Sequence, residues 1–289
     1  MQIWFNGICN GVLIALLATA FSIVYVPIGV FYIALAGIYV FTAYVTLQML
    51  SWGAHWSVAC LLALLSGIVL SILFDRFNHM LLQRKQASGG AHMISSLGLY
   101  MVMVQVSALI WGNDPRNLDL IPPRTLHLSG VSLACSQLAI LISGTIILTA
   151  LLFWTWHSGI GLRLRALANN PVQLALLGCN TTGMRLLIFG ISGALAAVAG
   201  ILHAGDLGLD PHIGMPALML AIVASIIGGR KNLAGPVIGG LLLGIIRSWV
   251  IWCTSARWQD TVTFAVLAIF LFLRPEGILG SQIRIEVKK

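Results

Sequence analysis

Residues 5–26, FNGICNGVLIALLATAFSIVYV, decide the class of fold to which this chain belongs. The stretch contains no charged side chain, and a helix needs about 20 consecutive apolar residues to cross a bilayer. No basic residue precedes it and it continues for a full span, whereas a cleavable signal peptide has a basic start and a shorter apolar region. The sequence therefore predicts a membrane-spanning helix here and no cleaved leader.

Similar apolar runs recur along all 289 residues of the chain. Hydrophobic residues make up 59% of the sequence and charged residues only 8%, against about 25% charged residues in soluble domains. We expect an all-α fold, a polytopic integral membrane bundle of about eight or nine transmembrane helices that forms a single domain over residues 1–289. The expected spans are residues 5–26, 30–50, 58–74, 92–111, 133–156, 184–203, 215–227, 237–253 and 261–273.

Two connections carry signals of local structure. Pro27 and Gly29 interrupt the first long apolar region, and such a break at membrane depth is tolerated only against protein or a water-filled cavity. The break is either a tight turn between two spans or a discontinuous helix, and we expect the turn. Within the polar connection 112–132, residues 125–129 alternate polar and apolar side chains, which predicts a brief strand.

Basic residues gather in the connections on one side of the membrane. Twelve Lys and Arg residues lie there, against Arg116, Arg124 and Arg257 on the other side. Because basic loops stay in the cytoplasm, we expect the C-terminus to be cytoplasmic and the connections 112–132 and 204–214 to be outside, with the N-terminus if Pro27 marks a full turn. The net charge of +8 thus reflects topology and predicts no nucleic-acid partner. The twelve are Arg76, Arg84, Lys85, Arg163, Arg165, Arg185, Arg230, Lys231, Arg274, Arg284, Lys288 and Lys289.

Residues 161–180, GLRLRALANNPVQLALLGCN, form the longest segment that does not read as lipid-facing. Its first half carries Arg163 and Arg165. A short helix then restarts, because Asn170 can cap it, Pro171 fits the first helical position and Gly178 can close it in a left-handed conformation. An ordered loop of this kind gives a partner protein a rigid surface through which it can move the membrane helices. The alternative is a surface loop that merely turns the chain.

Small residues are concentrated in the last third of the chain. At a spacing of four they let helix backbones approach closely, which is a main source of helix association in lipid. Smooth helix faces of this kind also allow one part of a bundle to rock against another. The glycines that we expect at helix contacts are Gly193, Gly200, Gly235, Gly239, Gly240 and Gly244.

Ionisable groups within the expected spans are few. Arg247 lies inside a span, and we expect it to pair with Asp206 or Asp260 or to extend to the headgroups. The sequence shows no chain of acidic and histidine residues through the membrane, and no phosphate-binding loop, HExxH or GxSxG motif. The five cysteines are scattered and form no metal-ligand pattern. We therefore expect a protein that is not an enzyme and has neither catalytic residues nor a metal site.

Four segments, taken together and in order, resemble the permease subunits of the branched-chain (hydrophobic) amino-acid ABC importers. Residues 161–180 are similar to the family pattern R-A-x-A-x-N-P-x-x-A-x-L-x-G-I-N, and IFGISGALAAVAGIL (188–202) to the Ala/Gly-rich helix that follows it. The resemblance continues in GGRKNLAGPVIGGLLLG (228–244) and ends in LRPEGILG (273–280), which is like the family's terminal R-P-x-G-L-x-G.

The resemblance implies a permease of the bacterial inner membrane that works with other subunits. These are a second permease, either a homologous chain or a second copy, two cytoplasmic ATP-binding subunits and an extracytoplasmic solute-binding protein. ATP and Mg²⁺ would be used by the ATP-binding subunits, with no cofactor on this chain. Residues 161–180 would hold the coupling helix, whose movement drives alternating access. The positions that would form this interface or shape the loop are Arg163, Arg165, Asn170, Pro171, Leu174, Leu177 and Gly178.

One departure from the family pattern concerns the transported solute. The family usually has a segment close to I-N-F-A-H-G-E near the second span, but here residues 30–38 read VFYIALAGI, without the Asn, His and Glu. We therefore expect a small amino-acid-like solute that need not be a branched-chain amino acid. The alternative function is a stand-alone secondary transporter of a small hydrophobic solute driven by an ion gradient, and a membrane-embedded enzyme or assembly factor is a third class.

Overall fold

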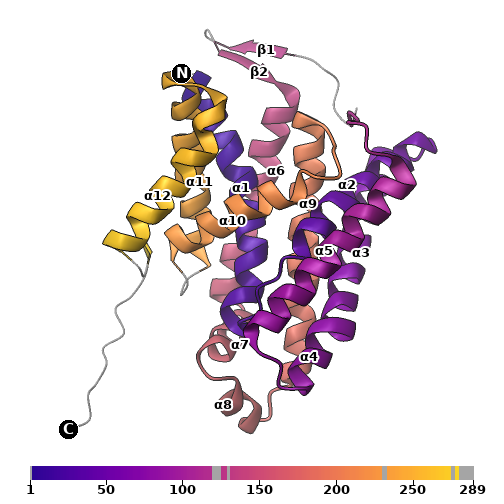
Figure 1. The fold of residues 1–289 in the computed structure, drawn as a ribbon, viewed down its shortest axis with the longest axis vertical. Helices are drawn as coiled ribbons and strands as arrows, with labels where there is room; N and C mark the ends of the chain where they lie inside the picture. The colour runs from indigo at the N-terminus through magenta and orange to yellow at the C-terminus, as the bar shows by residue number, and fades with distance from the viewer. Residues whose placement is uncertain (1, 119–124, 129–130, 230–232, 275–276, 280–289) are drawn as a thin grey trace.

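The computed structural model describes residues 2–118, 125–128, 131–229, 233–274 and 277–279. Within these ranges the chain is an all-helical membrane bundle with one small strand pair (Figure 1). Seven helices are long and apolar enough to cross a membrane, and two shorter apolar helices accompany them. The predicted fold class, a polytopic helical membrane bundle, is confirmed, and each of the nine expected apolar runs lies in a helix.

The first half of the chain begins with α1 (Gln2–Ile28), which ends one residue after Pro27. Gly29 has a positive φ of 73°, and the chain then turns back into α2 (Leu35–Ser51), so the expected tight turn is confirmed (Figure 1). The helices α3 (Trp56–Phe74) and α5 (Gly89–Trp111) follow. The strands β1 (Thr125–Leu128) and β2 (Val131–Ala134) pair antiparallel and confirm the strand predicted at 125–129.

The second half contains the remaining spans and the short helices between them. The helix α6 (Cys135–His157) leads into α7 (Gly159–Asn169) and α8 (Pro171–Leu176). The long α9 (Thr181–Leu207), the short α10 (Gly214–Gly228) and α11 (Ala234–Cys253) come next. A 3₁₀ turn, η2 (Ala256–Trp258), precedes the last helix, α12 (Gln259–Leu273).

The third span does not end where the sequence predicted. We expected it to stop at Phe74, but the helix continues as a π-helical segment, η1 (Asp75–His79), and as α4 (Met80–Arg84). Asp75 and His79 are buried in this extension rather than solvated in a loop. The prediction failed because a span was ended at the first charged residue, whereas the structure gives Asp75 a buried cationic partner.

Glycines set the closest helix contacts in the core. The helix α1 lies at the centre and contacts α6, α7, α9, α10 and α11. A Cβ atom at Gly240 of α11 would stand 2.6 Å from the Cα of Ala15 in α1, so only glycine permits this crossing. Each of the other predicted packing glycines also faces the backbone of a neighbouring helix. These contacts join Gly193 to α3, Gly200 to α2, Gly235 and Gly239 to α10, and Gly244 to α1.

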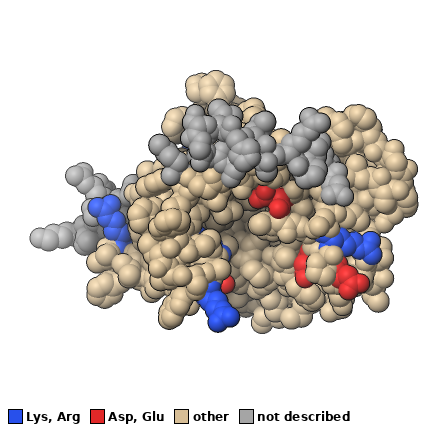
Figure 2. All heavy atoms as spheres, turned by 90° about the horizontal axis from the view of Figure 1, so that it is seen from above, with Lys and Arg blue, Asp and Glu red and all other residues tan. Residues whose placement is uncertain are grey.

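Connections gather at the two ends of the bundle (Figure 1). At one end lie the N-terminus, the strand pair and the loop after α9, where Arg116 and Leu209 exchange two backbone hydrogen bonds of 2.8 and 2.7 Å. Charged side chains are few on this end and stand apart around a central hollow (Figure 2). At the other end lie α4, α7 and α8. The basic residues Arg124, Arg230, Lys231, Arg284, Lys288 and Lys289 fall outside the described ranges.

Candidate functional site

The short helix α8 has the local structure that its sequence predicted. The Asn170 side-chain oxygen accepts hydrogen bonds from the backbone N–H groups of Val172 and Gln173, both at 3.1 Å, and so caps the helix. Pro171 occupies the first turn, where the missing N–H costs nothing. Gly178 follows the helix with a φ of 76°, in the left-handed region that a glycine adopts without strain.

One face of α8 is anchored and the opposite face is free. Leu174 is only 5% exposed and packs inward. By contrast Val172, Leu176 and Leu177 are 67%, 82% and 80% exposed. Leu174 was predicted at a partner interface, but it holds α8 on the bundle instead. The side chains of Val172 and Leu176 supply the outer apolar surface that the sequence reasoning had placed on Leu174. Figure 1 shows α8 at the extreme end of the molecule.

The basic residues predicted for this loop lie on α7. Arg163 and Arg165 are exposed, while Leu164 and Leu167 between and after them are buried. The helix α7 therefore seats an apolar edge on α1 and α6 and presents its charges outward. Together α7 and α8, residues 159–178, form an ordered unit that we call the coupling loop. Its outer surface combines two guanidinium groups with exposed aliphatic side chains.

A cavity of about 600 Å³ separates the coupling loop from the bundle. It is bounded by the end of α1, by α4 and by the first turns of α9, so it lies between the loop and the spans that the loop could move. Both Arg84 and Arg185 reach it. The lining residues are Pro27, Ile28, Met80, Gln83, Arg84, Leu167, Pro171, Val172, Ala175, Thr181, Thr182 and Arg185.

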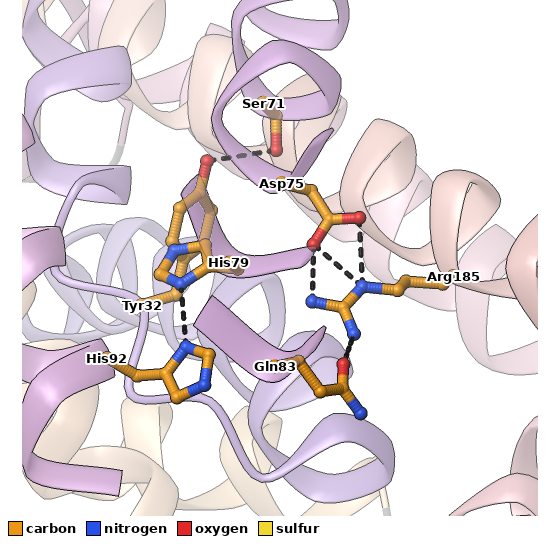
Figure 3. A network of polar contacts seen from close by, with 7 residues as sticks. All are labelled: Tyr32, Ser71, Asp75, His79, Gln83, His92 and Arg185. Atoms are coloured by element: carbon orange, nitrogen blue, oxygen red, sulfur yellow. Dashed lines mark hydrogen bonds and ion pairs between the residues drawn. The ribbon is translucent and has the colours of Figure 1, made fainter. Parts of the chain in front are cut away.

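A buried ion pair lies at the wall of this cavity (Figure 3). The Arg185 guanidinium donates through Nε to both carboxylate oxygens of Asp75, at 2.7 and 2.9 Å, and its Nη2 lies 2.6 Å from Oδ1. Arg185 Nη1 also donates to the Gln83 side-chain oxygen. Asp75 is 1% exposed and the Arg185 side chain 11%. A two-pronged contact of this kind has fixed geometry as well as charge.

Further polar and aromatic groups extend the pair toward α2 and α5. The Tyr32 hydroxyl donates to Ser71 at 3.2 Å; burial raises the pKa of this phenol, so it stays protonated. The Nδ1 atoms of His79 and His92 are 3.4 Å apart (Figure 3). The ring of His79 also lies edge-on to Tyr32, at 5.5 Å between centroids. We call these seven residues, Tyr32, Ser71, Asp75, His79, Gln83, His92 and Arg185, the inner network.

The sequence reasoning missed the inner network for an identifiable reason. It counted residues 75–91 as a loop and found no acidic or histidine chain in the spans. A signal was present, because Ser71, Asp75 and His79 recur every four residues and so share one face of a continuous helix. Among the described residues, no group of three or more His, Cys, Asp or Glu side chains could hold a metal ion.

The predicted contact of Arg247 forms with one of its two candidates. Arg247 Nη1 lies 2.8 Å from Asp260 Oδ1, and Arg247 also donates to Gln259 at 3.0 Å and to Thr263 at 3.2 Å. Asp206 is not a partner of Arg247 and accepts a hydrogen bond from Ser136 at 2.7 Å. The pair therefore ties α11 to α12 at the end opposite the coupling loop.

Comparison with known proteins gives a consistent result. Residues 3–271 match a family model described as the permease component of branched-chain amino acid transport systems. The chain is 30% identical to the high-affinity branched-chain amino acid transport system permease protein LivH of Escherichia coli K12, over 100% of this chain and 97% of that protein. It is 27% identical to BraD, named as the same kind of permease, of Pseudomonas aeruginosa, over 98% and 96%.

A more distant relative and a solved structure extend the comparison. The chain is 26% identical to LsrC of Escherichia coli O157:H7, an autoinducer 2 import system permease protein, over 84% of this chain and 70% of that protein. Its fold is similar to a chain of PsaBC from Streptococcus pneumoniae, solved in complex with Fab, with a TM-score of 0.54 over 96% and 93% of the two chains. At 12% identity this second likeness concerns the fold alone.

Proposed function

This chain belongs to the family of permease components of branched-chain amino acid transport systems, and from that premise we propose that it is the membrane-spanning subunit of an ATP-binding-cassette importer. It works with a second permease subunit, two cytoplasmic ATP-binding subunits and an extracytoplasmic solute-binding protein. The ATP-binding subunits hold and hydrolyse ATP with Mg²⁺, and this chain binds no nucleotide. Closure of those subunits moves the coupling loop and switches the bundle between outward and inward access.

The observation that carries the proposal is the surface of α8. A helix of six residues is too short to be stable on its own, yet its cap, its proline and the buried Leu174 hold it in place. What it holds outward is aliphatic, namely Val172, Leu176 and Leu177. Exposed apolar groups clustered beyond the membrane ends of the helices indicate a protein partner, and Arg163 and Arg165 beside them provide charges that an acidic cleft would complement.

The proposed location is the bacterial inner membrane, with the C-terminus in the cytoplasm. Basic connections remain on the cytoplasmic side, and α4, α7 and α8, which lie among such connections, share one end of the bundle (Figure 1). The C-terminal residues carry Arg284, Lys288 and Lys289, and by the same rule we place them on that side. The N-terminus lies at the opposite end. In this orientation the coupling loop faces the cytoplasmic ATP-binding subunits, and the hollow of Figure 2 faces the solute-binding protein.

We propose that the solute is small and amino-acid-like. The relatives LivH and BraD are named for branched-chain amino acids and LsrC for autoinducer 2, so relatives of this chain serve more than one solute class. Residues 30–38 are an apolar segment in which Tyr32 is buried and bonded to Ser71. This segment offers no carboxylate or imidazole to the ammonium group of an amino acid, which leaves selectivity to other residues of the path.

The test is purification of the full complex from native membranes in mild detergent, followed by protein identification and an ATPase assay. The proposal expects two ATP-binding subunits and a second permease to come with the chain, and expects the solute-binding protein to stimulate ATP hydrolysis. Recovery of the chain alone, together with ion-driven uptake by the purified chain in vesicles, would instead establish the secondary-transporter function.

A further inference from the structure

We propose that Asp75 and Arg185 are positioning residues that transmit movement of the coupling loop to the connection between α1 and α2, residues 29–34. This inference rests on the proposed function, since it requires ATP-driven movement of the loop. It assigns a role to a buried charge pair that neither touches the partner-facing surface of α8 nor lies in the middle of the membrane.

The first step links α8 to Arg185. Asn180 caps α9 by accepting a hydrogen bond from the Gly183 N–H at 2.9 Å, so α9 starts as an ordered helix with only four residues between it and α8. Arg185 lies in the second turn of α9. Its side chain and those of Pro171, Val172 and Ala175 in α8 line the same cavity. A displacement of α8 toward the bundle would therefore narrow this cavity and press α8 against the Arg185 side chain.

The second step links α9 to the third span. Gly67 of α3 and Gly193 of α9 bring the two backbones into contact. The third span and α9 run antiparallel. Asp75 and Arg185 therefore face each other two turns from this crossing (Figure 3). The backbone contact and the two-pronged ion pair hold the two helices at two points. Relative rotation of α9 and the third span is thereby restricted, and the inner end of the third span must follow α9.

The third step passes through the π-helical segment η1 to the α1–α2 connection. His79 is fully buried and its ring contacts Tyr32. The Ser96 hydroxyl accepts a hydrogen bond of 2.9 Å from the backbone N–H of Ala34. Tyr32 also packs edge-on against Phe189 of α9, at 5.1 Å between ring centroids. Tyr32 is thus attached to η1 and α9, which the Asp75–Arg185 pair joins. Ala34 is attached to α5, which the His79–His92 contact links to η1. These contacts provide a continuous route from the coupling loop to residues 29–34.

The segment η1 depends on its neighbours for this conformation. π-helical turns are rare and occur frequently at functional sites. Among the described residues, the buried atoms Asn78 Nδ2 and His79 Nε2 have no hydrogen-bond partner, and a buried unsatisfied group costs about 1–3 kcal/mol. The external contact of Asp75 with Arg185 therefore helps to keep η1 in place, as a transmitting element requires.

The test uses the full complex, with spin labels at single cysteines introduced into a background without the five native cysteines. One label stands at Ile142 on α6, a helix that contributes no residue to the inner network. Its partner is at Asn169, an exposed residue at the end of α7, to follow the coupling loop, or at Ile28, the residue that precedes the α1–α2 connection, to follow that connection. Both distances are measured with and without ATP and vanadate, together with ATP hydrolysis and retention of the ATP-binding subunits.

The decisive variant is Asp75→Asn/Arg185→Gln, which removes both charges and leaves no buried ion unpaired. We expect the ATP-dependent change at Asn169 to persist and the change at Ile28 to be lost, with the complex still assembled. The matched control is Arg247→Gln/Asp260→Asn, which neutralises the other Arg–Asp pair and should preserve both changes. If the double variant fails to assemble, Arg185→Lys, which keeps the charge but loses the two-pronged contact, is judged by the same measurements.

The outcomes separate the inference from the proposed function. A change at Ile28 that persists in a variant without the ion pair overturns the inference alone. If the unaltered chain retains no ATP-binding subunit, or if neither distance responds to ATP, the proposed function is wrong and the inference falls with it. Loss of the change at Ile28 in the control pair as well would show a general sensitivity to charge removal and would also overturn the inference.

Discussion

Replacing Asp75 by Ala should destabilise the bundle far more than replacing Asp260 by Ala, although each residue is the carboxylate of an Arg–Asp pair. Asp75 is 1% exposed and takes three contacts of 2.6–2.9 Å from Arg185. Its loss leaves a guanidinium group in a site that is 11% exposed. Breaking a buried pair from one side costs about 3–5 kcal/mol. Asp260 is 74% exposed, and Arg247, although its side chain is 16% exposed, keeps its hydrogen bonds to Gln259 and Thr263 when Asp260 is removed. We therefore expect a loss nearer that of a surface pair, about 0–1 kcal/mol.

The assay is equilibrium unfolding of the purified protein by SDS titration, with thermal unfolding by circular dichroism as a second measurement. The difference between the two variants should be at least about 2 kcal/mol, from the same ranges. The double variant Asp75→Ala/Arg185→Ala should recover part of the lost free energy of unfolding, because it leaves no buried ion unpaired. Equal destabilisation by Asp75→Ala and Asp260→Ala would refute the reasoning that burial decides how much each pair contributes to stability.

Three further predictions concern packing, docking and capping. Gly240→Val should lower the free energy of unfolding by about 1–3 kcal/mol or more, because its Cβ would meet the α1 backbone. The control is Gly98→Val, whose Cβ meets open space. Its free energy of unfolding, measured by the same SDS titration, should stay near the wild-type value. Leu176→Asp should abolish co-purification of the ATP-binding subunits without changing thermal unfolding, and Leu207→Asp, at the opposite end of the bundle, should leave co-purification intact. Asn170→Ala should cost about 1 kcal/mol of local stability, seen as faster amide hydrogen exchange confined to residues 172–176, and unchanged exchange there would contradict the capping role.

The number and order of the spans could be predicted because hydropathy is a local property of the sequence. Each expected apolar run became a helix, including the short α10, and the limits moved by only a few residues except at the third span. The structure of α8 was predictable for a similar reason. Its cap, first-turn proline and left-handed glycine lie within residues 170–178 and need no distant partner.

The inner network could not be predicted in the same way, because its decisive contact joins residues that are far apart in the sequence. Asp75 and Arg185 are separated by 110 positions, and nothing near Asp75 shows that a cation will be buried beside it. A charged residue after an apolar run normally marks the end of a span. The prediction for Leu174 was wrong for a related reason. Which residues of a short helix face the bundle depends on how the helix packs against it, and the local sequence does not show this.

The inner network also gives a physical meaning to the departure from the family pattern at residues 30–38. Where the family usually places Asn, His and Glu, this chain has buried apolar side chains and one polar group, Tyr32, whose hydroxyl donates to Ser71. That hydroxyl is occupied within the protein, and its ring is enclosed by His79 and Phe189. The segment is therefore suited to follow the helices around it rather than to bind a polar solute. On this argument loss of the Tyr32 ring would separate the α1–α2 connection from the coupling loop.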